Sequence, residues 1–166
     1  PTEHVRLAAQ GNAALNDLIT SGAYLPQSEP RLFLQKIQVD GVIQRSIIGS
    51  IDLSSVDPLP HEAVHQGRVQ ALAAHFREVH SMSSPVVLTS RSDDLDLRNL
   101  EESDQTALVT SFVATDGTEL SLWEISAGFA LTLDQLYIID GHHRVAAARE
   151  AKFSHLLVAY VPPSEL

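Results

Sequence analysis

The sequence contains no cysteine and is poor in basic side chains. Without a thiol the chain can form no disulfide bond and can perform no cysteine chemistry. Its 11 Lys and Arg residues stand against 21 Asp and Glu residues, which gives a formal net charge of −10 at pH 7. Binding to nucleic acid depends on cations that neutralise phosphates. We therefore expect no nucleic-acid partner.

Long apolar segments are also missing. No run approaches the ~20 apolar residues that cross a bilayer, and the N-terminus lacks a charged-then-apolar signal. We therefore expect a cytoplasmic protein with no membrane partner. The 166 residues are 44% hydrophobic, which is enough to bury one core, so residues 1–166 are expected to form a single domain. Composition leaves the oligomeric state open.

The apolar pattern alternates between strand-like and helix-like segments. Asp40–Gly41 and Asp116–Gly117 each separate two strand-like runs, so both dipeptides predict tight hairpin turns of the same kind. A helical pattern runs from His61 to about Val79. Strands are expected at residues 32–39, 42–51, 85–89, 107–114, 118–125, 136–139 and 153–161. Helices interleaved with hairpins predict an α+β fold with a mixed sheet and flanking helices.

The most informative segment is Asp140-Gly141-His142-His143-Arg144. It follows an apolar run at residues 136–139 and precedes an alanine-rich segment, so it predicts a strand that turns directly into a helix. The first N–H groups of a helix lack partners and carry partial positive charge. Together with Arg144 and two imidazoles they would bind a phosphate, and Gly141 would let the backbone approach it. In the alternative interpretation Asp140 caps the helix and the other side chains are solvated.

A second group of polar residues lies at the start of the 61–79 helical segment. On a helical wheel His61, His65 and Arg68 share one sector with apolar residues nearer the C-terminal end. We therefore expect these three side chains at the rim of the core, facing the 140–144 segment across a common cleft. His61 and His65 are also spaced to bind a metal, although no third ligand is evident. Capping or solvation is the alternative for these residues.

Residues 137–144, with the alanine-rich helix that follows, resemble the signature of a largely uncharacterised bacterial family. That family belongs to the ParB/sulfiredoxin-like superfamily, which also contains free serine kinases. The likeness extends upstream to His61-Glu62, to the strand that begins at Pro85 and to the hairpin that ends at Ile125.

The chain also departs from the proteins it resembles. Val64, Ala71 and Leu72 stand where the family commonly has Thr, Asp and Arg, so no role of those residues is carried over. His142 stands where sulfiredoxins have a cysteine, which excludes their redox chemistry. Because family members are longer at both ends, we expect this chain to be a fragment of a longer protein.

The resemblance implies a ParB/sulfiredoxin-like sheet and a phosphotransferase of the free serine kinase type. Its substrates would be ATP, ADP or another nucleotide, with or without Mg²⁺, and a small molecule with an amino-acid-like hydroxyl. Asp140 would position Mg²⁺ or the acceptor, and Glu62 would be the general base. As a first-turn acid, Glu62 would instead merely complement the helix dipole. The residues expected to hold the phosphates are His61, Gly141, His142, His143 and Arg144.

Two other functions fit the same residues. A non-enzymatic nucleotide-sensing or interaction module would keep the phosphate site and lack a working base. A metal-dependent hydrolase would use His61, Asp140, His142 and His143 as metal ligands. In the phosphate-binding interpretation the imidazoles gain charge near their ordinary pKa of about 6.5, so anion binding is expected to tighten toward pH 6.

Overall fold

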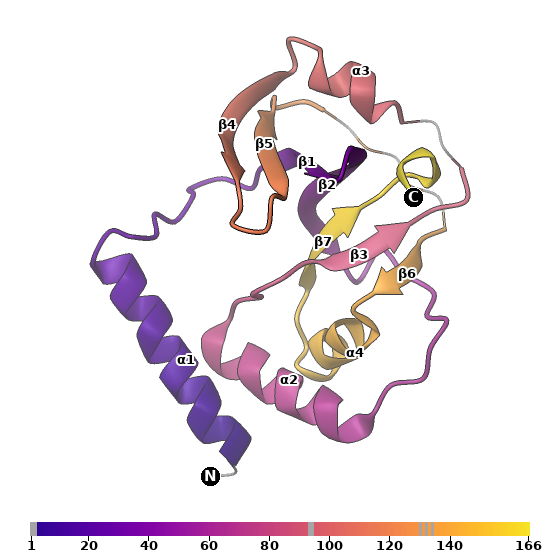
Figure 1. Cartoon of the computed structure of the whole chain (residues 1–166). Coiled ribbons are helices and arrows are strands. Elements are labelled where there is room, and N and C mark those ends of the chain that lie inside the picture. Colours follow the sequence, from indigo (N-terminus) through magenta and orange to yellow (C-terminus); the bar gives the residue numbers. More distant parts are fainter. Residues whose placement is uncertain (1–2, 93–94, 130, 132, 134) are drawn as a thin grey trace.

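The computed structural model describes residues 3–92, 95–129, 131, 133 and 135–166, and in it helices flank a seven-stranded sheet (Figure 1). The helices are α1 (Glu3–Thr20), α2 (Gln66–Val79), α3 (Leu97–Glu101) and α4 (His142–Glu150), with a short 3₁₀ helix, η1 (Pro163–Glu165), at the end. The strands are β1 (Leu32–Val39), β2 (Val42–Asp52), β3 (Val86–Thr89), β4 (Thr106–Val113), β5 (Glu119–Ile125), β6 (Tyr137–Asp140) and β7 (His155–Tyr160). The predicted α+β class with a mixed sheet is confirmed. None of the described helices combines the length and the apolar character needed to cross a membrane.

The strands lie in the order β4-β5-β1-β2-β7-β3-β6. Among the described residues β3 and β7 form the one parallel pair, and the other neighbours are antiparallel. The last strand, β7, therefore joins the two hairpins to the β3–β6 end of the sheet. Leu34, Val86, Leu88 and Leu156 are fully buried on these strands and belong to one apolar core. Strand β6 forms one edge of the sheet, next to β3.

The two hairpins differ in their turns. Asp40 and Gly41 form a two-residue turn between β1 and β2, and both have positive φ, 50° and 82°. That geometry matches the twist of the strands. The loop between β4 and β5 is longer, since the Ala114 N–H donates to the Thr118 carbonyl at 2.8 Å, and within its Asp-Gly pair only Gly117 has positive φ. The prediction of two turns of the same kind is therefore wrong for the second hairpin.

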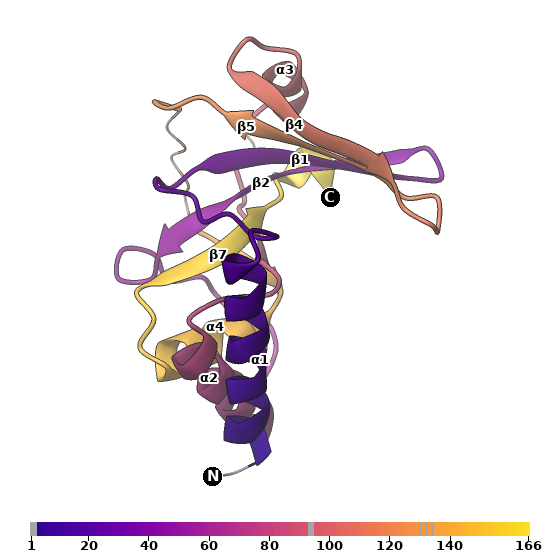
Figure 2. The same ribbon diagram turned by 90° about the vertical axis from the view of Figure 1, so that its left-hand side faces the viewer.

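Three helices gather on one side of the molecule. Helices α1, α2 and α4 lie together there, whereas α3 lies at the opposite end beside β4 and β5 (Figures 1 and 2). Helix α2 contacts both α1 and α4, and its buried residues include Val69, Ala73 and Phe76. Ala147 and Ala148 of α4 are fully buried. Their small side chains allow α4 to approach its neighbours closely.

The helix predicted from His61 begins only at Gln66. Upstream, Leu59 pairs with β6: its N–H donates to the Leu136 carbonyl at 2.9 Å, and its carbonyl accepts from the Ile138 N–H at 3.0 Å. Leu59 is therefore hydrogen-bonded to the edge strand β6 just before the expected helix start at His61. The predicted start is wrong, because this tertiary contact outweighs the helical pattern of the sequence.

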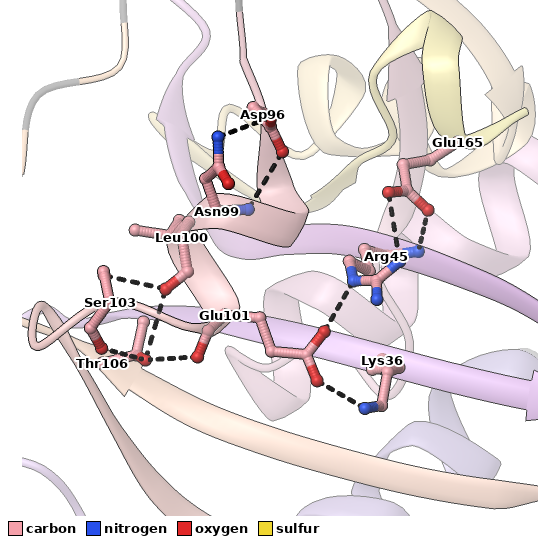
Figure 3. Close-up of polar contacts among 9 residues, drawn as sticks. All are labelled: Lys36, Arg45, Asp96, Asn99, Leu100, Glu101, Ser103, Thr106 and Glu165. Carbon is pink, nitrogen blue, oxygen red and sulfur yellow. Dashed lines mark hydrogen bonds and ion pairs between the residues drawn. The ribbon is translucent and has the colours of Figure 1, made fainter.

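Four charged residues join the sheet to α3 and η1 (Figure 3). The Arg45 side chain on β2 is 9% exposed. Its Nε donates to Glu101 Oε2 at 2.7 Å, and its backbone N–H donates to Glu165 Oε2 at 3.0 Å. Glu101 also accepts from the Lys36 ammonium. Burial alone would raise the pKa of Glu101, but hydrogen bonds from Lys36 and Arg45 outweigh burial and lower this pKa. Lys36, Arg45, Glu101 and Glu165 are called the ion-pair cluster below.

Candidate functional site

The signature turn (Asp140–Arg144) carries the chain from β6 directly into α4. Strand β6 ends at Asp140, Gly141 is the N-cap residue with a φ of 98°, and α4 begins at His142. The predicted strand-to-helix turn is confirmed. Gly141 is buried, and a Cβ atom placed on it would lie 3.0 Å from Val86 Cγ2 and 3.0 Å from Arg144 Nε. Both the positive φ and the lack of space require glycine at this position.

A pocket of about 560 Å³ opens beside the signature turn. Besides the five residues of the turn, its lining comes from the loop before α2, from α2 and from the segment before β3. Those other lining residues are Glu62, Arg68, Leu72, His75, Phe76, Met82, Ser83 and Ser84. The fold therefore brings the signature turn, Glu62 and Arg68 to one cavity, which is called the turn pocket below.

Hydrogen bonds hold the Arg144 side chain in the wall of the turn pocket. Its guanidinium donates to the Asp140 carboxylate, to Ser84 Oγ and, at 2.7 Å, to the Pro85 carbonyl. The Arg144 side chain is 19% exposed, whereas that of Asp140 is 70% exposed. Among the described residues no side chain caps α4, so the alternative interpretation of Asp140 as a helix cap is wrong. The carboxylate instead orients the guanidinium.

His142 is buried and faces the loop at residues 61–65. Its Nε2 accepts from the His61 N–H at 3.4 Å and lies 3.3 Å from His61 Nδ1, and the two rings are perpendicular with centroids 4.4 Å apart. Its Nδ1 lies 3.9 Å from Glu62 Oε2. Burial and the neighbouring His61 hold the pKa of His142 below its ordinary value of 6.5, although the Glu62 and Asp140 carboxylates oppose this shift. His142 is therefore neutral at pH 7.

His143 makes a matching contact one residue further along α4. Its Nε2 accepts from the backbone N–H of His65, the N-cap residue of α2, at 3.0 Å. His143 lines the turn pocket, whereas neither His61 nor His65 is part of its lining. The helical-wheel argument that aimed these two side chains at the cleft is wrong, because residues 61–65 lie outside α2. In the part of the chain that is described, no three His, Cys, Asp or Glu side chains form a group suited to a metal.

Glu62 reaches the turn pocket from the irregular loop. Its side chain is 65% exposed, and its carboxylate lies 3.8 Å from His61 Nε2 and 3.9 Å from His142 Nδ1. Because α2 begins at Gln66, the interpretation of Glu62 as a first-turn acid is wrong. A solvent-accessible carboxylate at the rim of a cavity is free to accept a proton from a bound ligand.

Sequence reasoning undervalued two residues of the turn pocket. The sequence places Arg68 at the polar end of a helical sector, outside the predicted phosphate-binding residues. In the structure Arg68 lines the turn pocket and forms no ion pair with any described residue. Ser84 holds Arg144, and the sequence analysis assigned it no role. A lone serine before a strand carries no signal of such a contact, because the partner lies 60 residues away.

Comparison with known proteins places the chain in a family. Residues 2–155 match the family model described as "Protein of unknown function (DUF1015)". The chain belongs to the DUF1015 family. The match covers Glu62, Arg68 and the whole signature turn. No curated protein and no solved structure matches the chain, so a function for this DUF1015 chain has to be argued from the site itself.

Proposed function

We propose that the turn pocket of this DUF1015 chain binds the phosphate groups of a nucleotide such as ATP or ADP. The observation that carries the proposal is the pocket of about 560 Å³ formed where Arg68, Arg144 and the N-terminus of α4 meet. Pockets for small ligands usually measure about 300–1,000 Å³. The start of a helix offers N–H groups and partial positive charge to an anion. The pocket thus combines a suitable size with suitable chemistry.

Two arginines would share the work of neutralising the phosphates. Asp140 and Ser84 hold Arg144 at a set place, which lowers the entropy that its guanidinium loses on binding. Arg68 supplies a charge that no described carboxylate neutralises. His142, being neutral, would add a hydrogen-bond donor and no charge. This differs from the sequence-based expectation, in which both imidazoles helped to neutralise the ligand.

The reaction that fits this inventory is phosphoryl transfer to a small hydroxyl-bearing molecule. Glu62 would take the proton of the acceptor hydroxyl while the hydroxyl oxygen forms a bond to the γ-phosphorus of ATP. The bond from that phosphorus to the nucleoside diphosphate would break, and the diphosphate would leave. Phosphoryl transfer asks chiefly for positioning and charge neutralisation. Any Mg²⁺ would arrive with the nucleotide as part of the substrate, since in this proposal Asp140 serves as the partner of Arg144. The resemblance of residues 137–144 to a family whose superfamily also contains free serine kinases supports this choice.

The second candidate function is a nucleotide-sensing module without chemistry. Its supporting observation is that Glu62 sits on an irregular loop and is 65% exposed, a less constrained setting than a general base usually has. Glu62→Gln separates the two candidates. A kinase variant should keep nucleotide affinity and lose turnover of ATP to ADP, whereas a sensor should lose nothing because there is no turnover to lose.

We also propose that the fold is of the ParB/sulfiredoxin-like type. The support is the sequence likeness around the signature turn together with the mixed sheet and its flanking helices. An experimental structure of the chain, superposed on members of that superfamily, tests this assignment. A different strand connectivity around β6 and β7 would contradict it.

The binding proposal is tested first by thermal shift with ATP, ADP, CTP and GTP, each with and without Mg²⁺, and then by calorimetry. A ligand that binds the folded chain alone raises its melting temperature. Arg144→Ala should weaken nucleotide binding about ten- to a hundredfold. Arg98→Ala is the matched control, because Arg98 is an exposed arginine of α3, which lies away from the turn pocket (Figure 1). Failure of every nucleotide and of inorganic phosphate to bind would rule the proposal out.

A further inference from the structure

A second cavity, of about 650 Å³, opens where α2 and α4 end, and it is called the helix-end pocket below. Its lining consists of Arg77, residues 80–82 after α2, residues 151–155 after α4, and Leu157 of β7. No residue of the signature turn lines it, because that turn lies at the other end of α4 (Figure 1). The volume is within the range of about 300–1,000 Å³ that is usual for small-ligand sites.

The charge of the helix-end pocket differs from that of the chain as a whole. The chain has 21 acidic and 11 basic residues, yet among the described residues that line the pocket none is Asp or Glu, and Arg77 and Lys152 are both present. Arg77 donates to the Glu150 carbonyl at 2.8 Å and lies 3.9 Å from its carboxylate, which neutralises it in part. Lys152 forms no ion pair with any described residue. The pocket therefore has positive charge available to a ligand.

Both helices at this pocket end on a left-handed residue that carries a side chain. His80 ends α2 with a φ of 53°, and Lys152 follows the last residue of α4 with a φ of 61°. Glycine is the usual residue at such a position, because a Cβ atom strains this conformation. Within the described chain one other non-glycine residue has a positive φ, Asp40 in the first hairpin. Two strained positions thus direct side chains to the same cavity.

The helix dipole does not account for the charge of Lys152. Cations are favourable near the C-terminal end of a helix, but each helix already has an arginine in its last turn, Arg77 in α2 and Arg149 in α4. Neither arginine has a positive φ. A further cation at a strained position therefore adds little to the helix itself, and it remains available to a ligand.

Apolar side chains form another part of the helix-end pocket. The half-buried Phe153 ring stacks against the His80 imidazole, with centroids 6.4 Å apart, and packs against the Phe76 ring, with centroids 5.5 Å apart. Met82 Sδ accepts from the Leu157 N–H at 3.4 Å. These contacts hold Phe153 and Met82 in place. An aromatic ring and a thioether beside two cations suit a ligand that has an aromatic body and an anionic group.

We propose that the helix-end pocket binds a small aromatic acid. The carboxylate or phosphate group of the acid lies between Lys152 and Arg77, and its ring lies against Phe153 and Met82. The acid is a second ligand of the protein, and its binding does not depend on a nucleotide in the turn pocket.

Four probes separate the parts of this proposal: benzoate, phenyl phosphate, benzamide and inorganic phosphate. Benzamide has the shape of benzoate without its charge, and inorganic phosphate has the anionic group of phenyl phosphate without its ring. Each probe is titrated into the intact nitrogen-15-labelled chain, and the amide signals are followed by NMR. We expect benzoate or phenyl phosphate to shift the Ser81, Lys152 and Phe153 amides. Benzamide and inorganic phosphate should bind there about tenfold more weakly.

Lys152→Gly is the informative variant, because glycine is favoured at this backbone conformation. The variant should fold with an unchanged or higher melting temperature, while its affinity for the aromatic anion falls about tenfold. Asp40→Gly is the matched control, since it makes the same kind of change at a φ of 50° outside the pocket, and it should bind the probe as the wild type does. A lower melting temperature of Lys152→Gly with unchanged affinity would make Lys152 a structural residue of α4 and overturn the proposal.

The wild-type titrations decide the proposal even without the variants. Shifts confined to the His143 and Arg144 amides would assign the anion to the turn pocket. Equal binding of benzamide or of inorganic phosphate would show that the helix-end pocket recognises the ring or the charge alone. Either result, like a failure of both aromatic anions to bind, overturns the proposal.

Titration with ATP and ADP is a separate arm, so that this proposal and the proposed function can fail independently. Binding of an aromatic anion in the helix-end pocket, with no nucleotide or inorganic phosphate bound in the turn pocket, supports the second site and refutes the proposed function. Nucleotide binding in the turn pocket, without binding of either aromatic anion, refutes the second site alone.

Discussion

The ion-pair cluster and the turn pocket use the same kinds of side chain in opposite ways. In the cluster, the side chains of Arg45, Glu101 and Glu165 are 9%, 14% and 12% exposed, and each meets an opposite charge. In the turn pocket, the Glu62 side chain is 65% exposed, and Arg68 forms no ion pair within the described chain. Charges that are buried and paired hold elements together, whereas charges left exposed around a cavity stay available to a ligand.

Arg144 lies between these two cases. Like Arg45 it is mostly buried and bound by a carboxylate, but that carboxylate, Asp140, is itself open to solvent. An anion entering the turn pocket can therefore reach the guanidinium without displacing a buried partner. The comparison predicts that substitutions in the ion-pair cluster change stability, and that substitutions in the turn pocket change binding.

The largest effect is expected from Glu101→Ala, which leaves Arg45 and Lys36 without their shared partner. Removing one member of a buried ion pair typically costs about 3–5 kcal/mol, and we expect about 3 kcal/mol in the free energy of unfolding at pH 7, measured by urea denaturation. Glu102→Ala, at the exposed next residue, is the control and should change stability by less than about 0.5 kcal/mol. Equal effects of the two substitutions would remove the distinction between cluster and surface.

This effect should also depend on pH. The pKa of Glu101 is lowered in the folded chain from its ordinary value of 4.5. Its contribution to stability is therefore present above about pH 4.5 and is lost as the pH falls through the folded-state pKa. The difference between wild type and Glu101→Ala should shrink in the same range.

Gly141→Ala should have the next largest effect. The substitution combines an unfavourable positive φ with contacts at 3.0 Å to Val86 and Arg144, and we expect a loss of about 2 kcal/mol. Gly117→Ala is the matched control, because Gly117 also has a positive φ but open space around it, and it should cost about 1 kcal/mol. Denaturation of both variants measures the difference. Equal losses would show that the signature turn does not need a close approach of Arg144.

Arg68→Ala should change binding and leave stability almost unchanged. We expect nucleotide affinity to fall about tenfold, or ~1.4 kcal/mol, with the free energy of unfolding altered by less than about 0.5 kcal/mol. Calorimetry and denaturation of the same sample measure both. A large loss of stability with intact binding would place Arg68 among the structural charges.

The smallest expected effect is the contribution of His142 to the pH dependence of stability. Because its pKa is lowered in the folded chain from 6.5, the unfolded chain takes up the proton first. Stability therefore declines as the pH falls below about 6.5. His142→Gln removes this titration and should flatten the slope of unfolding free energy between pH 7 and pH 5.5, whereas His80→Gln should not. Identical slopes in wild type and His142→Gln would contradict the lowered pKa of His142.

Much of the fold was predictable from local patterns. The first hairpin followed from Asp40–Gly41 between two apolar runs, and the signature turn followed from an apolar strand, one glycine and an alanine-rich helix. In both places the signal lies within a few residues of the structure that it predicts. The second hairpin shows the limit, because Asp116–Gly117 marked the right place for a turn but not its length.

The candidate site was predictable only as a set of residue types. The sequence by itself determined that a helix begins directly after Gly141 and that Arg144 lies in its first turn, because glycine and alanine have strong local preferences. Tertiary structure decided where α2 begins, which partner holds Arg144 and why His142 stays neutral. Those features depend on Leu59 pairing with β6, on Ser84 and Pro85 about 60 residues before Arg144, and on the burial of His142 beside His61. Contacts between residues so far apart in the sequence produce no periodic pattern in it. They form only once the sheet has brought β6 beside the 61–65 loop.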